Sequence, residues 1–568
     1  MADKTSTALS QAQRALDAGR SLMDRAWAQL RTRCQRDDGK LSGKLLDENQ
    51  LASYDGAVCD AALTGAQFML RYAEKALASD EGDVCLEERF ALIAAAEALT
   101  ETRLRVGTRP MDYGLTAEIV ADTIDNAEVR AFCDAQLATQ NLAEVGQLVR
   151  DRDGFVGVSM LDDDHKMMRD TFRQFANDVV APKAEEVHSH DLMIPDEILD
   201  QVKELGCFGI SIAERYGGLQ PDDREDTLSM CVVTEELSRG SLGAAGSLIT
   251  RPEILARALM AGGTDEQKSQ WLPKLAAGDP LCAVAVTEPD FGSDVAGMKF
   301  KATKTEGGWL LNGTKSWLTF GGKAGVLLVL ARTDPDPSKG HKGLSVLLAE
   351  KPSFEGHDFE YTQQPGDHGG APGGGTISGR AIATIGYRGM HSYETFFDNY
   401  FVPDANLLGG EGGLGKGFYF IMAGFSGGRI QTAARAVGVM QAAFEKAISY
   451  SEERKVFGRP VGDYQLTQVK IARMATALCM IRRFTYGVAE LMDDGKGQTE
   501  ASMVKLYAGQ KAEWLTREAL QIHGGMGYAE ETPVSRYFVD ARVLSIFEGA
   551  EETLALKVVA RALIDAAK

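Results

Sequence analysis

The sequence predicts a mostly helical protein with a central β-sheet domain, and changes of pattern along its 568 residues indicate this. Residues 1–150 and 160–280 carry apolar residues at three- and four-residue spacing, which is typical of amphipathic helices. Residues 281–405 change to short segments rich in β-branched residues, separated by Gly and Asn turns. Long helical patterns return over residues 410–568. We therefore expect a helical leader, a helical domain, a β domain and a second helical domain.

The leader is expected to be purely helical and to take no part in chemistry. Its helical patterns cover Gln11–Arg33, Ala57–Ser79, Glu87–Val106 and Ala117–Val149. No cluster of catalytic residue types occurs there, and the acidic run Asp151–Asp164 is typical of a domain boundary. We expect the leader to pack on the rest of the chain or to control assembly.

The β region opens with a pattern suited to a flat ligand. One predicted strand ends in the hydroxyl of Thr287, and a second carries Trp317, Leu318 and Thr319. Because side chains on a strand alternate, Trp317 and Thr319 should face one way and Leu318 the packing layer. An aromatic ring beside a hydroxyl suits a planar, hydrogen-bonding ring such as a flavin. The motif W-x-T alone is more typical of an ordinary sandwich strand with an exposed Thr.

Composition excludes several classes of partner. The formal charge of -20, without a basic run, argues against nucleic acid. No apolar stretch is long enough to span a bilayer, so we expect no membrane association. The first residues lack the features of a secretory or transit peptide, so the expected location is cytoplasmic.

The cysteines and histidines predict no metal site. The cysteines lack C-x-x-C spacing and are expected to be small core residues in a reducing compartment. They are residues 34, 59, 85, 133, 207, 231, 282 and 479. His188 and His190 could ligate a metal, but without further clustered ligands a solvated loop is the preferred interpretation.

Seven motifs from about Leu161 onward occur together in one order. They are EELSRGS (235–241), GTDEQKSQWLPKLAAGD (263–279), VTEPDFGSD (286–294), NGTKSWLTFGG (312–322), ERKVFGRPVGDYQ (453–465), QIHGGMGY (521–528) and SIFEGAEET (545–553). On these motifs the chain resembles the acyl-CoA dehydrogenase family over about 400 residues. The resemblance implies an N-terminal helical domain, a middle β-sheet domain and a C-terminal four-helix bundle, here behind an extra helical extension.

The resemblance also implies FAD as cofactor and an acyl-CoA as substrate. Thr287 and Thr319 match positions that hydrogen-bond the flavin ring, Trp317 matches one that packs beside it, and Ser293 matches a contact to the acyl-CoA. Further positions match contacts to FAD across a subunit interface, which implies a homodimer or homotetramer. These positions are Arg454, Phe457, Gln465, Gln521 and Gly525. The implied electron acceptor is electron-transfer flavoprotein.

Glu548 matches the catalytic base of most family members. A carboxylate can remove the weakly acidic α-hydrogen of a thioester if donors hold the carbonyl oxygen as charge builds. The alternative is that Glu548 caps the helix that follows. Ala550 stands where many relatives carry Thr, which puts one FAD contact in doubt, and the negative charge of Glu551 and Glu552 needs a partner.

The substrate is expected to be a short branched acyl-CoA with a free carboxylate. The leader, the segment SLITRPEILARAL and the Gly-rich insertion at 363–380 resemble a branch of the family with such a substrate. Arg251 and Arg429 are the candidates to neutralise that carboxylate, and for each a salt-bridged structural arginine is the alternative. The insertion is expected to be a mobile surface loop, with a lid role left open. Alternatives are a short branched-chain or glutaryl-type dehydrogenase, an acyl-CoA oxidase, or an inactive helical scaffold.

Overall fold

The computed structural model describes residues 7–79, 85–366 and 374–567. The chain divides into two compact units. Unit 1 combines the residues up to Met168 with those from Thr432 onward, and unit 2 is Arg169–Gln431. The leader and the C-terminal helices therefore share one unit although more than 250 residues separate them in the sequence.

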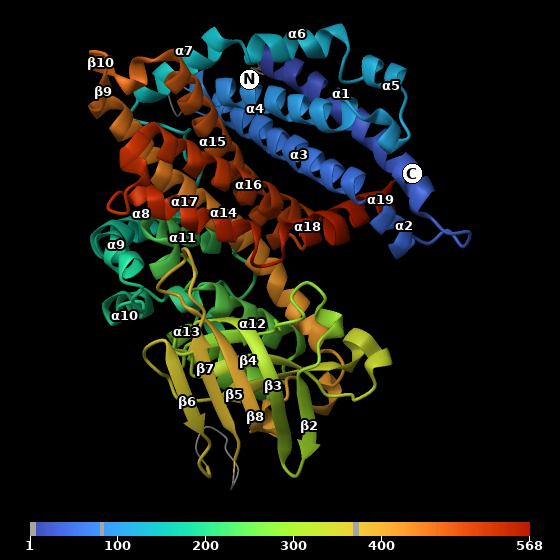
Figure 1. Cartoon of the computed structure of the whole chain (residues 1–568), viewed down its shortest axis with the longest axis vertical. Coiled ribbons are helices and arrows are strands. Elements are labelled where there is room, and N and C mark those ends of the chain that lie inside the picture. Colours follow the sequence, from blue (N-terminus) through green and yellow to red (C-terminus); the bar gives the residue numbers. More distant parts are fainter. Residues whose placement is uncertain (1–6, 80–84, 367–373, 568) are drawn as a thin grey trace. The chain divides into compact units, whose positions relative to one another are not determined.

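Unit 1 is all helical apart from a two-stranded hairpin. Leader helices α3 and α4 run beside α15, α3 also contacts α16, and α1 packs on α3 and α4 (Figure 1). The leader elements are α1 (Thr7–Cys34), α2 (Gly43–Glu48), α3 (Gln50–Ala78), α4 (Cys85–Thr102), α5 (Ala117–Asp122), α6 (Ala127–Gln136) and α7 (Thr139–Arg150). The C-terminal elements are the end of α14 (Gly417–Glu453), β9 (Lys455–Val456), β10 (Arg459–Pro460), α15 (Gln465–Asp493), α16 (Gln498–His523), α17 (Pro533–Ala541), α18 (Glu551–Thr553) and α19 (Arg561–Ala566).

The helical pattern predicted over Ala117–Val149 is confirmed, and the segment forms three helices. The backbone leaves helical geometry at Thr123, where φ is -103° and ψ is -93°. The Asn126 side chain then accepts a hydrogen bond from the Val129 N–H at 2.9 Å and starts α6 as its N-cap. Helical periodicity continues across such a break, so the pattern alone does not reveal it. The other three leader helices are confirmed.

The leader packs tightly on the C-terminal helices, as expected. A Cβ on Gly146 of α7 would lie 2.0 Å from the Gln468 carbonyl oxygen of α15, so only glycine permits this approach. The buried Arg150 donates to Glu452, to Asp463 and to a backbone carbonyl. Backbone and charge contacts therefore tie the end of the leader to the distant half of unit 1.

Unit 2 combines helices with one eight-stranded sheet, which confirms the predicted fold class. Its helices are most of α8 (Asp163–Phe175), then α9 (Ala181–Ser189), α10 (Asp196–Glu204), α11 (Thr227–Gly240), α12 (Thr250–Gly262), α13 (Asp265–Ala277) and the start of α14. The strands are β1 (Cys282–Ala285), β2 (Lys301–Thr305), β3 (Gly308–Thr319), β4 (Val326–Arg332), β5 (Leu344–Glu350), β6 (Asp358–Thr362), β7 (Thr376–Ala381) and β8 (Ser392–Pro403). The sheet order is β1-β4-β2-β3-β8-β7-β6, and β5 pairs with β4.

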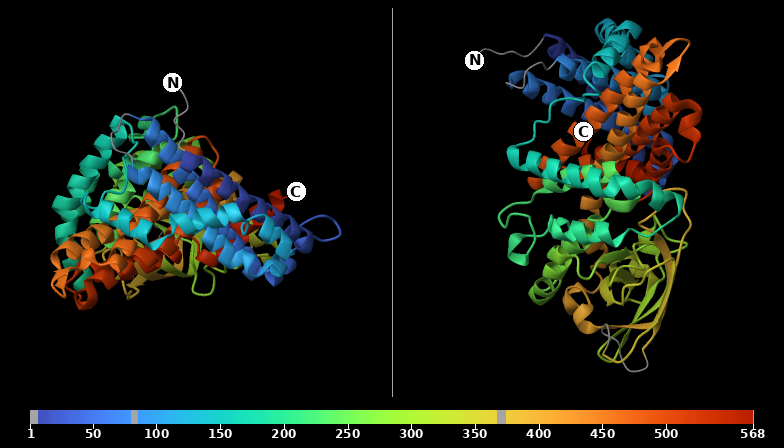
Figure 2. Two further views of the ribbon diagram at one scale, coloured as in Figure 1. Left: turned by 90° about the horizontal axis from the view of Figure 1, so that it is seen from above. Right: turned by 90° about the vertical axis from the view of Figure 1, so that its left-hand side faces the viewer.

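Strands β4 and β5 of this sheet are buried on both faces. In β4, Val326 and Leu328 pack with helices α12 and α13, whereas Leu327 and Val329 pack in the core on the other face. This alternation follows from the two-residue period of a strand, and it explains why β4 is a continuous apolar run. The right-hand view of Figure 2 shows the green helices of unit 2 along one side of the yellow-green sheet.

The Gly-rich insertion predicted at 363–380 is partly strand. Thr376–Ala381 is β7, paired with β6 and β8. Gln363 is buried, and its side chain both donates to and accepts from the backbone of Phe401. Residues 367–373 lie outside the described part of the chain, so the prediction of a mobile loop or lid applies to them alone.

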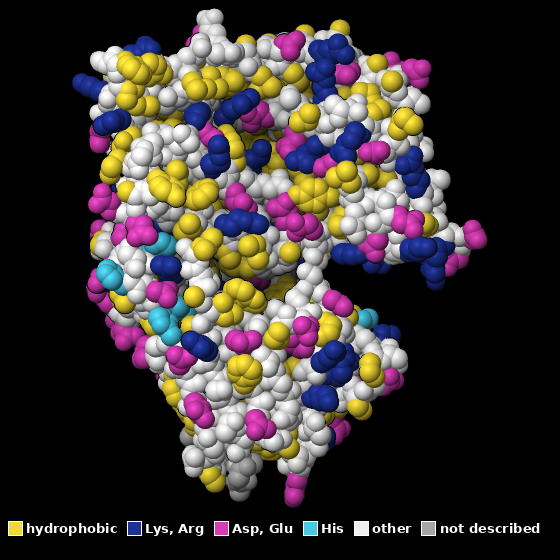
Figure 3. Space-filling model, viewed as in Figure 1, with side chains coloured by type: hydrophobic (Ala, Val, Ile, Leu, Met, Phe, Trp, Pro, Cys, Tyr) yellow, Lys and Arg dark blue, Asp and Glu magenta, His cyan; other side chains and the backbone are white. Residues whose placement is uncertain are grey.

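Charged side chains of both signs lie on the surface. The face in Figure 3 mixes basic and acidic side chains, without one dominant sign of charge. Over the described residues, no helix combines the length and the apolar character needed to cross a membrane. The cysteines are free, and six of the eight are buried, as predicted; Cys133 is half-buried and Cys85 is exposed.

Candidate active site

Glu548 lies in a short, strained turn of unit 1. Its φ of +53° is unusual for a residue with a side chain, and Gly549 follows at +100°. The Lys505 ammonium donates to the Gly549 carbonyl at 2.6 Å, and the Arg435 guanidinium lies 4.9 Å from the Phe547 ring centre. The carboxylate is half-buried, and within the described residues it has no side-chain hydrogen bond or ion pair. The turn therefore holds Glu548 in place and leaves its carboxylate available.

The interpretation of Glu548 as a helix cap is wrong. The helix that follows, α18, has Ala550 as its N-cap, and no side chain caps it. Because Glu548 lies two residues before that cap, its carboxylate is not used by the helix.

A leader residue binds next to this turn. The Tyr54 hydroxyl of α3 donates to the Glu551 carboxylate, and the Gln510 amide donates to the same oxygen at 2.9 Å. Burial, and then Glu551, raise the pKa of the Tyr54 hydroxyl, so it stays a neutral donor. Tyr54 is the partner of Glu551 that the sequence did not identify. Nothing in its local pattern distinguishes it from other leader tyrosines.

In unit 2, Thr287, Trp317 and Thr319 lie where β1 and β3 end. The Ser316 N–H donates to the Thr287 carbonyl at 2.9 Å, which joins the two segments next to Trp317. Thr319 is buried, and its hydroxyl lies 2.9 Å from that of Ser392. The structure thus brings these three predicted residues together.

Simple strand alternation does not account for Trp317, which corrects the sequence argument. The register between β3 and β8 shifts between Lys315 and Leu318, where β3 has one extra residue, and Trp317 has a φ of +56°. Leu318 is fully buried, as predicted, whereas Trp317 is 55% exposed. The bulge therefore turns a large aromatic ring toward solvent. An exposed ring beside two hydroxyl groups fits the planar ligand proposed from the sequence.

Arg251 is buried at the start of α12 without an acidic partner. Its guanidinium donates to the Ser247 carbonyl at 3.2 Å and to the Tyr387 hydroxyl at 3.4 Å. Over the described residues, no carboxylate lies within 4.0 Å of it, although it is only 6% exposed. The alternative of a salt-bridged Arg251 is therefore wrong. Tyr387, which sequence reasoning missed, has a φ of +58°.

The other two predicted substrate contacts, Arg429 and Ser293, are less buried than Arg251. Arg429 is half-buried in α14, and Ser293 is exposed in the turn after β1. Both belong to unit 2.

The predicted cofactor contacts of unit 1 are all exposed. Phe457, at the tip of the β9–β10 hairpin, is 98% exposed at a φ of +48°. Tyr528 and Leu466 are 88% and 70% exposed. The predicted residues at this surface are Arg454, Phe457, Gln465, Gln521 and Gly525. Such a concentration of exposed apolar side chains is typical of a surface that binds a partner.

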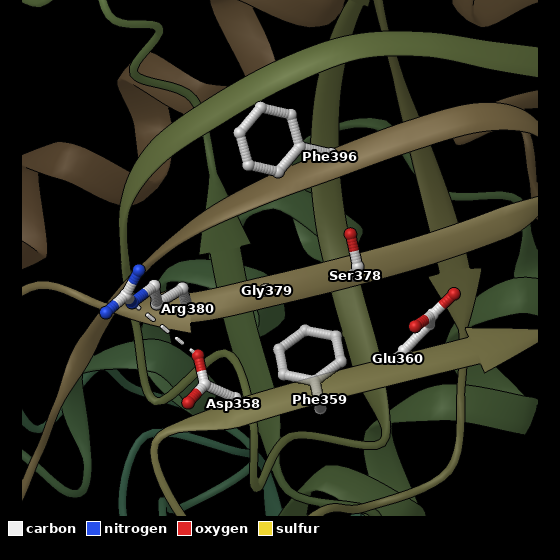
Figure 4. A pocket seen from close by; sticks show the side chains of 7 residues that line it. All are labelled: Asp358, Phe359, Glu360, Ser378, Gly379, Arg380 and Phe396. Atoms are coloured by element: carbon white, nitrogen blue, oxygen red, sulfur yellow. Dashed lines mark ion pairs between the residues drawn. The ribbon is translucent and has the colours of Figure 1, made fainter.

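A depression of about 410 Å³ on β6, β7 and β8 is not part of this site (Figure 4). Arg380 and Asp358 form a 3.8 Å ion pair across it, and both are largely exposed. Figure 4 shows Phe359 and Phe396 on neighbouring strands of the same surface. It contains none of the predicted site residues.

Comparison with known proteins covers most of the chain. Residues 162–279, 283–400 and 415–564 match the family models described as acyl-CoA dehydrogenase N-terminal, middle and C-terminal domains. A (2S)-methylsuccinyl-CoA dehydrogenase of Cereibacter sphaeroides is 39% identical over 93% of each chain. A mitochondrial 2-methylacyl-CoA dehydrogenase of Solanum tuberosum is 36% identical over 69% of this chain and 89% of its own.

A solved structure of a Mycobacterium smegmatis glutaryl-CoA dehydrogenase in complex with FADH2 is also similar. It is 27% identical with a TM-score of 0.61, and the match covers 72% of this chain and 96% of that one. The shorter matches span about the length of the three family domains, whereas the Cereibacter match also includes most of the leader.

Proposed function

Because the chain belongs to the acyl-CoA dehydrogenase family, we propose that it oxidises (2S)-methylsuccinyl-CoA to mesaconyl-CoA, a step of the ethylmalonyl-CoA pathway. The likeness to a methylsuccinyl-CoA dehydrogenase over 93% of both chains, leader included, supports this substrate. The match to the Solanum 2-methylacyl-CoA dehydrogenase is shorter and spans 69% of this chain. The reaction removes an α-proton and a β-hydride from the acyl group.

The observation that carries the substrate assignment is the buried Arg251. A buried cation without an opposite charge is costly, so its retention is explained by a ligand that supplies the charge. The free carboxylate of methylsuccinyl-CoA is such a group. The Tyr387 hydroxyl, held by the guanidinium, can donate to the same carboxylate. Arg429 is the second candidate for this contact.

Glu548 is proposed to act as the base. Its carboxylate takes the α-proton, and the backbone N–H of the same residue is the chain's own candidate donor to the thioester oxygen as enolate charge develops. The strained turn fixes the carboxylate, since Lys505 and the Phe547–Arg435 contact hold both sides of it. A fixed base loses less entropy on reaching the reactive geometry.

Unit 2 offers residues that fit FAD. Trp317, exposed on its bulge, can pack beside the flavin ring, and Thr287 and Thr319 can hydrogen-bond it. FAD, when bound, supplies the hydride acceptor. Ser293 is proposed to contact the acyl-CoA. The exposed unit 1 surface around Phe457 fits the cofactor of a second copy, so we propose a homodimer or homotetramer with electron-transfer flavoprotein as acceptor.

The test is an absorbance assay of the purified protein over a panel of CoA esters with an artificial electron acceptor. We expect a yellow protein that turns over methylsuccinyl-CoA faster than 2-methylbutyryl-CoA. The reverse preference would remove the dicarboxylate assignment. Formation of peroxide in place of acceptor reduction would indicate an oxidase. Release of carbon dioxide from glutaryl-CoA would indicate a glutaryl-type enzyme. A colourless protein without FAD would indicate an inactive scaffold.

A further inference from the structure

Three potential metal ligands that lie far apart in the sequence meet in unit 2. Asp191 follows α9, His357 precedes β6 and His391 precedes β8, and their ligand atoms all lie within 4.8 Å of one another. Figure 3 shows histidine side chains, in cyan, where Figure 1 labels α9 and α10. The sequence drew attention to His188 and His190 on this loop, but the residue that joins the cluster is Asp191.

The distances suit a tetrahedral ion. The His391 Nε2 atom lies 3.1 Å from the His357 Nε2 atom and 3.1 Å from Asp191 Oδ1. The His357 Nε2 atom lies 3.8 Å from Asp191 Oδ2. Ligands about 2.0–2.1 Å from a zinc ion lie roughly 3.3 Å apart in a tetrahedron, so small shifts would complete the geometry.

The hydrogen bonds of His391 fix which ring nitrogen faces the cluster. Its Nδ1 lies 3.2 Å from the Gly389 carbonyl oxygen, which can only accept, so Nδ1 carries the proton. In the neutral ring, Nε2 then presents a lone pair to the Asp191 carboxylate, and two acceptors in contact need a cation between them, either a metal ion or a proton. A metal-bound histidine commonly donates its other N–H to a backbone carbonyl in this way.

We propose that Asp191, His357 and His391 bind one divalent transition-metal ion of the zinc class. Imidazole nitrogens with one carboxylate are typical zinc ligands. His391 is buried, whereas His357 and Asp191 are partly exposed, so water can fill the fourth position. The ion would join the loop after α9 to the starts of two strands.

A cation already lies beside the cluster. The Arg388 Nε atom is 3.6 Å from Asp191 Oδ1, and its Nη1 donates to the His188 carbonyl at 2.9 Å. The guanidinium offsets part of the carboxylate charge, so we expect weaker binding than at a site without it. The Arg388 guanidinium is a neighbour of the Asp191 carboxylate and supplies no ligand atom.

The site connects to the strand ends that hold the proposed flavin contacts. The His391 carbonyl accepts from the Phe320 N–H at 2.7 Å, and Ser392, the next residue, contacts the Thr319 hydroxyl. An ion that holds His391 would therefore stabilise the ends of β3 and β8. A ligand that binds the folded state alone raises its stability by RT ln(1 + L/Kd), where L is the free ligand concentration.

A hydrogen-bond network is the competing explanation. The His357 Nε2–H could donate to the Asp191 carbonyl at 3.0 Å and to His391 Nε2 without any ion. This explanation leaves the Asp191 carboxylate against the His391 lone pair, but it needs no metal. Titration with zinc distinguishes the two.

The experiment uses the tag-free, full-length protein after chelator treatment and dialysis. We expect calorimetry with zinc chloride to give one site per chain, and zinc to raise the melting temperature. His357→Gln, an exposed position that should not affect folding, should lose both effects. His190→Gln is the matched control on the neighbouring loop, where the ring contacts only the Glu186 carbonyl, and it should retain them.

Zinc binding that His357→Gln leaves unchanged, or that His190→Gln abolishes, would overturn the proposal. If the unmodified protein does not bind zinc, the hydrogen-bond network is favoured and the metal-site proposal is overturned as well. Asp191→Asn, which keeps the size but removes the charge, should weaken binding about tenfold or more. A crystal of the zinc-treated protein should give an anomalous peak at the zinc edge between the two histidines, and a peak elsewhere would contradict the assignment.

Discussion

Two regions of the molecule each bury an arginine, and they neutralise it in opposite ways. In unit 1, Arg150 at the end of the leader is paired with Glu452 and Asp463 and also donates to a carbonyl. In unit 2, the partners of Arg251 among the described residues are a carbonyl and the Tyr387 hydroxyl. A paired arginine is complete as a structural contact. Arg251 retains a positive charge that a bound anion can neutralise. We therefore expect Arg150 to have a structural role in unit 1 and Arg251 a functional role in unit 2.

Glu548 belongs with the unpaired groups although it lies in unit 1. Within the described residues its carboxylate has no side-chain partner, whereas its neighbour Glu551 has Tyr54 and Gln510. The comparison is therefore between paired groups, expected to affect stability, and unpaired groups, expected to affect catalysis.

The largest effect is expected at Glu548. Glu548→Gln should lower kcat by about 10³-fold or more, because the amide is nearly isosteric but cannot take a proton. Flavin absorbance and the melting temperature should be unchanged. Glu551→Gln is the paired control and should retain most activity. A Glu548→Gln enzyme with more than a tenth of the normal rate would contradict its role as base.

Arg251→Gln should have the next largest effect, confined to one class of substrate. We expect kcat/KM for methylsuccinyl-CoA to fall about 100-fold, roughly 3 kcal/mol, because its carboxylate would be left buried and unpaired. Turnover of 2-methylbutyryl-CoA, which has no such carboxylate, should be kept or improved.

Two further variants sharpen this test. Arg257→Gln is the matched control, since Arg257 lies on the same helix but pairs with Glu253 at 2.8 Å. It should not discriminate between the two substrates. Arg429→Gln tests the second candidate for the same contact. Equal losses on both thioesters in Arg251→Gln would make Arg251 structural.

Arg150→Gln should affect stability and not selectivity. Breaking its contacts to Glu452 and Asp463 should destabilise unit 1 by about 2 kcal/mol, below the 3–5 kcal/mol of a fully buried pair because both carboxylates are partly exposed. Denaturant or thermal unfolding measures this loss. The ratio of activity on methylsuccinyl-CoA to activity on 2-methylbutyryl-CoA should stay constant. A changed ratio would contradict the division into a structural arginine in unit 1 and a substrate-binding arginine in unit 2.

The smallest effect is expected for Tyr54→Phe, which tests whether the leader influences the turn of Glu548. Loss of one hydrogen bond to Glu551 should cost about 1 kcal/mol, and a less rigid turn should lower kcat by several-fold with little change in KM.

Tyr72→Phe is its matched control. The Tyr72 hydroxyl joins the leader to the Val158 carbonyl at 2.9 Å, in a different part of unit 1. It should reduce stability to a similar extent and leave kcat unchanged. An equal fall of kcat in both variants would indicate general damage to the leader.

The sequence by itself determined the fold class and the family, and it named the candidate site residues. Apolar residues recur about every 3.6 positions in leader helices that bury one face, whereas β4, buried on both faces, is a short continuous apolar run. Short motifs, through the family resemblance, predicted roles for Thr287, Thr319 and Glu548.

Only the tertiary structure decided the features that depend on distant residues. The bulge that exposes Trp317 requires the register of two strands, and the Tyr54–Glu551 contact joins residues 497 positions apart. The same holds for the lack of a carboxylate at Arg251 and for the meeting of Asp191 with His357 and His391. Local sequence propensity acts over a few residues. Strand pairing, side-chain burial and metal coordination depend on which distant chain segments pack together, so no local sequence pattern reveals them.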